Sequence, residues 1–344
     1  MPLFLLAREE ASGEKPEPSP SPAADAAAMT VVERLESLDP EQVKQALSVL
    51  QQRHVASKSL DAAGLERATL RGLLGELHPG VELTGAEQPA AAATSPFRAE
   101  TLPGGVGYIR LGSLQAATVT EVEGTLKDFA ANKVDAVVLD LRATPETGGY
   151  DMAAAVAGRF TAKGSPLFSL VDGGGVPLKT FVSDGPQVFN GVVVVVADGA
   201  TAGAAEALAA VLRKNVRAMV VGTATSGRAV EFSSISLGKG QSLRFADAEV
   251  RVEGLPAIYP LGLRPDIEVG QEADVRENVL ADGLEKGASA FVFELERAQM
   301  NEAALVAGTN PEIDAAENAE GLVDRPLQRA VDLVTAIRLF GPKN

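Results

Sequence analysis

The chain has 344 residues, 46% of them hydrophobic, and a formal net charge of −15 at pH 7. This length suits one large domain or two modest ones, and the acidic balance argues against nucleic acids and anionic membranes, which attract clustered lysine and arginine. The lack of cysteine excludes disulfides and cysteine nucleophiles, and two histidines, His54 and His78, are too few for a multi-histidine metal site. We therefore expect no metal site and no cofactor.

Residues 1–28 predict a disordered leader, because a segment rich in Pro, Ser, Ala and Glu buries too little apolar surface to offset its ordering entropy. The apolar stretch at 2–7 is either a frayed terminus or the remnant of a signal peptide. No run of 18 apolar residues occurs, so we expect no transmembrane segment.

Residues 29–88 predict an N-terminal helical region. Its first helix begins at Asp39, with Pro40 at the first position and Gln42 placed to complete a capping box. The apolar face of this helix carries Val43, Ala46, Leu47 and Leu50. A second helix is predicted over about 61–77 from its leucine spacing.

After a predicted linker at 89–96, strands alternate with helices through a core at 97–271. The strands are nearly continuous in apolar residues, which is typical of a mainly parallel sheet covered by helices on both faces. Strands are predicted within 105–114, 134–142, 191–198 and 217–222, and helices within 118–133, 150–160 and 201–214. Two later segments, 229–235 and 241–252, predict antiparallel strands. We therefore expect an α/β fold.

Residues 272–344 predict a C-terminal helical segment with an acidic surface. It ends in a helix capped at Asp324, whose apolar face carries Leu327, Val331, Val334 and Ile337. The acidic residues predict a solvated helical face, with partner binding as the alternative.

Five motifs stand in a fixed order within the core. They are GYIRLGSL (107–114), VVLDLRATPETGGYDMAAAVAGRF (137–160), VVVVVADGATAGAAEALAAVL (192–212), RAMVVGTATSGRAV (217–230) and LGLRPDIEV (261–269). Together they resemble the core of the tail-specific, or carboxy-terminal processing, serine peptidases. The resemblance covers about half of the chain. It implies a crotonase-like core, proteolysis by a Ser–Lys dyad, and an extracytoplasmic location, periplasmic or secreted.

The resemblance places Gly203 where the family has its serine nucleophile. The flanking Thr201, Ala202, Ala204 and Glu206 fix this alignment. Glycine has no side-chain atom that could form an acyl intermediate.

Arg228 stands where the family has its lysine base, 25 residues after Gly203, which is the family's spacing. Arginine is not deprotonated in proteins and cannot act as a general base. Phe232 replaces a glutamine that helps to position the lysine. Three changed positions at consistent spacing predict a peptidase-like protein that has lost catalysis.

The resemblance also locates a region for peptide binding and an oxyanion hole at Gly148, Gly149 and Ala204. The glycine-pair segment, ATPETGG, is longer than the family's usual Asn-Pro-Gly-Gly. The stretch between the early helices and residue 107 is too short for the family's PDZ domain. We therefore expect a pseudoenzyme that binds a protein or an extended peptide by strand addition. A homo-oligomer is left open.

Two alternatives remain at this stage. One is an active serine peptidase with a rearranged nucleophile, and the other is a crotonase-like acyl-binding enzyme that needs only an oxyanion hole. A phosphate loop at 222–229 is disfavoured because Arg-Ala leads into a strand pattern rather than a helix. Lys239 is expected in an exposed hairpin turn rather than as a displaced base. Both histidines are expected on or beside N-terminal helices.

Several polar residues near the serine position have structural explanations. We expect Thr201 to be the helix N-cap, Ser226 a turn residue, and Glu206 a first-turn acid that favours the helix dipole. Asp140 and Arg142 are expected to form a structural ion pair. Arg228 should pair with a carboxylate, for which Asp198, Glu206 and Glu231 are the candidates, or with several carbonyls.

Overall fold

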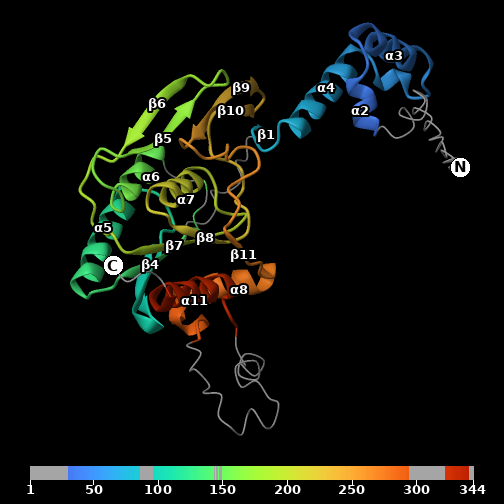
Figure 1. The fold of residues 1–344 in the computed structure, drawn as a ribbon. Helices are drawn as coiled ribbons and strands as arrows, with labels where there is room; N and C mark the ends of the chain where they lie inside the picture. Colours follow the sequence, from blue (N-terminus) through green and yellow to red (C-terminus); the bar gives the residue numbers. More distant parts are fainter. Residues whose placement is uncertain are drawn as a thin grey trace, which may run out of the picture. The chain divides into compact units, whose positions relative to one another are not determined.

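The computed structural model describes residues 30–85, 96–142, 144, 146, 149–293 and 322–340. The predicted leader at 1–28, most of the predicted linker and Gly148 lie outside the described residues. The chain divides into two compact units, one ending at Leu73 and the other beginning at Leu74 (Figure 1). No helix in the described ranges is long and apolar enough to cross a bilayer.

The first unit is helical. Its elements are α2 (Val31–Glu36), α3 (Pro40–Arg53), η1 (Ser57–Ser59) and most of α4 (Ala62–Glu76). The predicted capping box is confirmed, because the Asp39 carboxylate accepts from Gln42 N at 2.8 Å and the Gln42 side chain accepts from Asp39 N at 2.9 Å. Neither α3 nor α4 contains a buried residue, and on the predicted apolar face of α3 Leu47 and Leu50 are exposed while Val43 is half-buried.

The second unit is built around a six-stranded sheet of order β11-β8-β7-β4-β3-β2. All neighbouring pairs are parallel except β2 with β3, which confirms the predicted parallel sheet. Its strands are β2 (Arg98–Leu102), β3 (Val106–Arg110), β4 (Ala136–Asp140), β7 (Val192–Ala197), β8 (Met219–Gly222) and β11 (Ile267–Glu268).

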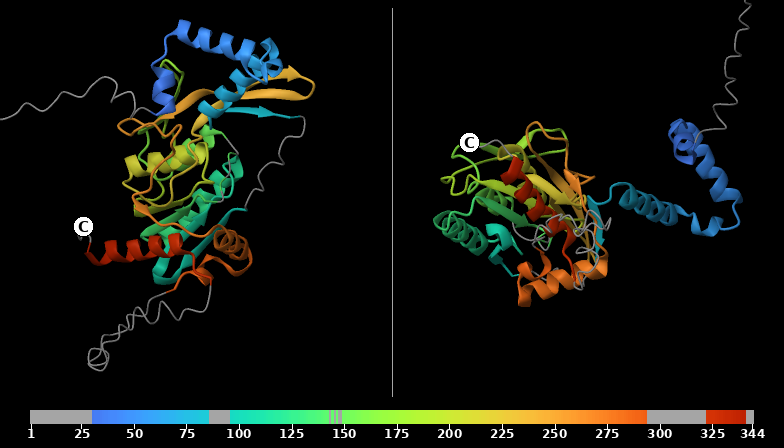
Figure 2. Two further views of the ribbon diagram at one scale, coloured as in Figure 1. Left: turned by 90° about the vertical axis from the view of Figure 1, so that its right-hand side faces the viewer. Right: turned by 60° about the horizontal axis from the view of Figure 1, so that its bottom comes forward.

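Helices cover both faces of this sheet, as Figures 1 and 2 show. Along β4, Val137 and Leu139 pack with helices on one face, while Ala136 and Val138 pack with helices on the other, because successive strand side chains alternate. The first face carries α5 (Ala116–Ala131), α6 (Tyr150–Ala157) and α7 (Ala204–Asn215); the second carries η3 (Ala288–Phe291) and α11 (Arg325–Phe340), with α8 (Ala273–Lys286) beside them.

A second, antiparallel sheet packs against α6 and α7 on their far side. Its strands are β1 (Val81–Thr84), β5 (Pro166–Val171), β6 (Pro177–Val182), β9 (Val230–Gly238) and β10 (Gln241–Arg251). The predicted antiparallel pairing of 229–235 with 241–252 is confirmed as β9 with β10, and Lys239 lies in the exposed turn between them. β1 belongs to this sheet, although the sequence placed its residues in the N-terminal helical region.

A buried ion-pair network joins the parallel sheet to α11. The Arg142 guanidinium donates to Asp140 at the end of β4 and to Asp324 at the start of α11, with distances of 2.7–3.0 Å. Asp324 also caps α11 by accepting from Leu327 N at 3.1 Å. The expected Asp140–Arg142 pair and the expected cap at Asp324 are therefore confirmed, and one arginine connects them.

This network predicts a loss of stability in acid. Burial alone would raise the pKa of Asp140, but the charge of Arg142 and its hydrogen bonds outweigh burial and hold that pKa well below its usual range. A depressed folded-state pKa contributes stability above the unfolded-state value, about 4, and this contribution is lost as the pH falls further. Urea titrations at pH 7, 5 and 3 should show most of the loss below pH 4. A free energy of unfolding that stays constant from pH 5 to 3 would contradict this assignment.

Candidate functional site

Gly203 lies in the turn between β7 and α7. It is the N-cap of α7, with φ 60° and ψ −119°, a conformation that glycine adopts and L-residues rarely do. A strained strand–turn–helix is the geometry by which α/β-hydrolases present a nucleophilic serine. A Cβ built on Gly203 would lie 3.1 Å from Cγ of Glu146. Gly203 contributes no side chain to this turn, and Glu146 occupies the adjacent space.

Glu206 connects this turn to the segment at 225–228. Its fully buried carboxylate accepts five hydrogen bonds, from Gly203 N (3.0 Å), Thr225 Oγ1 (2.5 Å), Ser226 Oγ (3.1 Å), Gly227 N (2.8 Å) and Arg228 N (2.8 Å). Burial raises the pKa of Glu206, and the hydrogen bonds act in the opposite direction. Glu206 thus holds Gly203 and the segment at 225–228 side by side.

A Glu206→Gln variant is expected to lose about 2 kcal/mol of unfolding free energy. The amide NH₂ would direct a donor at one of the backbone N–H groups and leave that group unsatisfied in the interior. Urea denaturation measures the loss. The control is Glu121→Gln on the exposed side of α5, which should change stability by less than about 0.5 kcal/mol. Equal effects of the two substitutions would show that Glu206 does not hold the turns together.

The Arg228 side chain belongs to a closed ring of four charged groups, which we call the ion-pair ring: Arg228, Glu82, Arg244 and Glu146. Arg228 Nε donates to Glu146 at 2.8 Å, and its Nη1 pairs with Glu82. Arg244 Nη1 lies 3.2 Å from Glu82, and its Nη2 pairs with Glu146. Each arginine therefore contacts both glutamates, and the ring joins β1, the loop before α6, the start of β9, and β10.

Phe232 supports the ion-pair ring. The guanidinium carbon of Arg244 lies 3.8 Å from the centroid of the phenyl ring, and that of Arg228 lies 4.8 Å from it. Both distances fall within the range of cation–π attraction. The phenyl ring of Phe232 thus contacts both arginines of the ion-pair ring.

The expected carboxylate partner of Arg228 exists, but all three named candidates for its guanidinium were wrong. Asp198 pairs with Arg276, and Glu206 binds backbone and hydroxyl groups, including Arg228 N, rather than the guanidinium. Glu231 is exposed, because alternation on β9 turns it away from Phe232.

Thr201 is not the helix N-cap, which corrects the sequence-based expectation. The helix begins after Gly203, and the buried Thr201 hydroxyl instead donates to Leu141 O at 3.1 Å and accepts from Asp198 N at 3.1 Å. Ser226 lies in the turn as expected, and its backbone N donates to Thr201 O. Gly149 is the N-cap of α6, and Ala204 is the first residue of α7.

Three residues of the site were missed on the sequence: Glu82, Glu146 and Arg244. Glu146 carried a signal, since it is the charged residue inserted in the lengthened glycine-pair segment. Glu82 and Arg244 lie directly opposite each other in the β1–β10 ladder, 162 residues apart, and nothing local marks that pairing.

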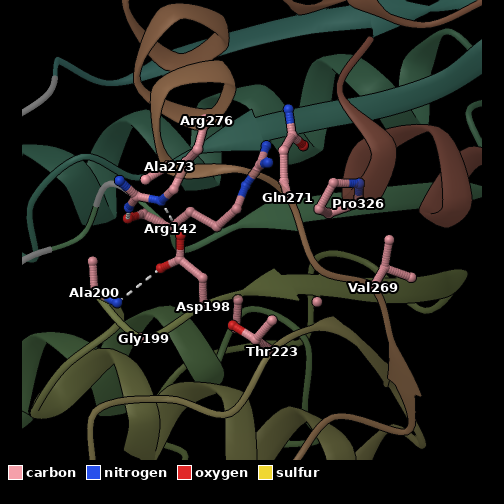
Figure 3. A pocket seen from close by; sticks show the side chains of 12 residues that line it. Arg142, Asp198, Gly199, Ala200, Thr223, Val269, Gln271, Ala273, Arg276 and Pro326 are labelled. Carbon is pink, nitrogen blue, oxygen red and sulfur yellow. Dashed lines mark hydrogen bonds and ion pairs between the residues drawn. The ribbon is translucent and has the colours of Figure 1, made fainter.

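A separate pocket of about 270 Å³ opens at the carboxyl ends of β7 and β8. Figure 3 shows Asp198 between Ala200 and Arg276 in this pocket. Asp198 accepts from Ala200 N at 2.9 Å and pairs with Arg276, which donates to Arg142 O. The lining of this pocket comes from the ends of β7 and β8 and from residues near α8 and α11, and it includes neither Gly203 nor Arg228. The charged residues of the pocket therefore hold the loop before Gly203 without belonging to the ion-pair ring.

The core of this chain is similar to known peptidases. Residues 105–269 match the model of peptidase family S41. The matched segment contains both Gly203 and Arg228, and it supports the tail-specific peptidase family named from the motifs.

Two curated relatives agree with this assignment. The chain is 32% identical to a carboxyl-terminal-processing protease of Picosynechococcus over 167 residues, which cover 48% of this chain and 40% of that protein. It is 30% identical to one of Synechocystis over 192 residues, covering 53% and 44%. The chain thus spans less than half the length of these relatives. A solved photosystem II D1 C-terminal processing protease aligns with a TM-score of 0.45 and 24% identity, over 61% of this chain and 52% of that one.

Proposed function

We propose that this protein is a family S41-like pseudoprotease that binds an extended peptide or protein segment without cleaving it. The observation that carries the proposal is Gly203 at the turn before α7. Acyl transfer needs a nucleophile at this place, and the nearest side chain there is the carboxylate-bearing Glu146, paired with two arginines.

The base position supports the same proposal. Arg228 stays protonated at any physiological pH, and it sits between Glu82 and Glu146, which stabilise its positive charge. Neither a proton acceptor nor an acyl acceptor therefore stands at the two positions that would carry out hydrolysis.

Strand β9 is the proposed binding element. Among the described strands it pairs with β10 alone, and at the start of its other edge Val230 O accepts from Tyr150 Oη at 2.8 Å, so an added strand would displace this contact or pair beyond it. The nine residues of β9 contain no proline or lysine, the residues that commonly protect an edge from pairing. β9 begins two residues after Arg228, so a segment added along its edge would pass the site.

Fluorescein-labelled casein tests binding and cleavage together. We expect its anisotropy to rise with protein concentration, while gel electrophoresis shows the casein intact. A Ser234→Lys/Ser236→Lys variant places two charges on β9 and should weaken binding about tenfold. Leu178→Lys on the exposed face of β6, at the other edge of the same sheet, is the matched control and should bind like the wild type. Equal binding by all three proteins would exclude β9 as the binding edge.

An extracytoplasmic location is part of the same proposal and rests on the family similarity. A translational fusion to alkaline phosphatase, which is active only outside the cytoplasm, would test it in a bacterial host.

A further inference from the structure

The two arginines of the ion-pair ring are held by contacts that do not involve Glu146. Both guanidinium groups lie over Phe232, and Arg244 is fixed within β10 opposite Ser234 of β9. Arginine presents a rigid fork of donors suited to carboxylates. The guanidinium groups of Arg228 and Arg244 would therefore keep their positions if one of the two glutamate side chains moved away.

The two glutamates are held differently. Glu82 lies within β1, where the strand ladder sets its backbone directly opposite Arg244. Glu146 lies outside any helix or strand, in the loop between β4 and α6. Removing the Glu146 carboxylate would leave two positive charges against one negative charge, with donors of both arginines unpaired. Glu146 is thus the member of the ring that can be exchanged.

Glu146 also occupies the place that a bound segment would need. Its Cγ is the nearest side-chain atom to a Cβ built on Gly203, at 3.1 Å. A strand added beside β9 would place every second side chain on the face that carries Phe232. We propose that Arg228 and Arg244 form a carboxylate-binding site, which Glu146 fills in the free protein and an acidic side chain of the bound segment fills in the complex. This inference rests on the proposed function.

Charge balance makes the exchange selective. Replacing one carboxylate by another keeps both arginines paired, whereas a neutral side chain in the same place would leave partly buried charges without partners. Glu146 competes with the ligand, so the free protein binds acidic segments more weakly than a protein without this competing carboxylate.

Propionate tests the arginine site without any peptide. Glu146→Ala removes the internal carboxylate and leaves room for a small one. Sodium propionate should raise the melting temperature of Glu146→Ala saturably, relative to sodium chloride at equal ionic strength, because a ligand of the folded state stabilises it. The wild type and Glu146→Ala/Arg244→Gln should show no such rise. Equal responses of all three proteins would overturn the proposal.

A matched pair of peptides tests selectivity. Two fluorescent strand-forming peptides differ only by one central glutamate or glutamine. In both the wild type and Glu146→Gln, the glutamate peptide should bind at least about tenfold more tightly than the glutamine peptide, and each peptide should bind Glu146→Gln more tightly than the wild type. If both peptides bind with no difference in any protein, the exchange is wrong and the peptide-binding function stands. If neither peptide binds but propionate stabilises Glu146→Ala, the arginine site stands and the proposed function is wrong.

Discussion

An Arg142→Met variant is expected to lose about 3–5 kcal/mol of unfolding free energy, because removing one partner of a buried ion pair leaves the other charge uncompensated. Arg142 is 2% exposed, and the two aspartates that it pairs are 0% and 1% exposed. Among the described residues, this substitution would leave Asp324 without a cation, whereas Asp140 would keep Tyr108 and, at 3.8 Å, Arg110, and it would weaken the attachment of α11 to the sheet. Chemical denaturation of the full chain measures the loss.

Two further variants show whether stranded charge is the cause. Lys127→Met breaks an exposed ion pair with Glu123 on α5 and should change stability by less than about 0.5 kcal/mol. Adding Asp324→Asn to Arg142→Met should recover part of the loss, since Asp324 then carries no charge that lacks a partner, while Asp140 stays beside Arg110. A double variant less stable than Arg142→Met would point to lost packing rather than to electrostatics.

Restoring the family's dyad is expected to restore almost no activity. In Gly203→Ser, Arg228 cannot accept the serine proton. In Gly203→Ser/Arg228→Lys, the new lysine would stand between Glu82 and Glu146, and two nearby carboxylates favour its protonated form. Serine at φ 60° also carries backbone strain of about 1–3 kcal/mol. We expect casein cleavage by the double variant to stay at least about a hundredfold below that of an active carboxyl-terminal-processing protease.

The two carboxylates beside residue 228 predict which variants cleave casein faster. Adding Glu146→Ala to the double variant removes one of the two carboxylates beside the lysine and clears the space in front of residue 203. Any trace of cleavage should therefore increase in the triple variant. Robust cleavage by Gly203→Ser alone would refute the assignment of Arg228 to the base position.

Local sequence patterns predicted most of the core. The continuous valines of β7, the capping box at Asp39 and the cap at Asp324 each depend on residues a few positions apart, and the structure confirms them. Strand β6 was missed because its residues are mostly exposed and lack the apolar pattern of a buried strand.

The contacts of the site were harder to predict than its positions. Gly203 and Arg228 were placed at the site by the register of the motifs that resemble the family. Glu82 reaches Arg228 only through the pairing of β1 with β10, and the chain between them gives no local sign of that ladder. Thr201 was assigned as a cap because it precedes the helix, but the turn at Gly203 delays the helix start by two residues.

Labelling of the wild-type chain with a fluorophosphonate probe tests the loss of catalysis most directly. The probe reacts covalently with activated serines, and an active carboxyl-terminal-processing protease serves as the positive control. We predict that the purified wild type is not labelled and that casein incubated with it stays intact, because residue 203 offers no nucleophile. Stoichiometric labelling at one serine, mapped by mass spectrometry and abolished by changing that serine to alanine, would show that the nucleophile has moved rather than disappeared.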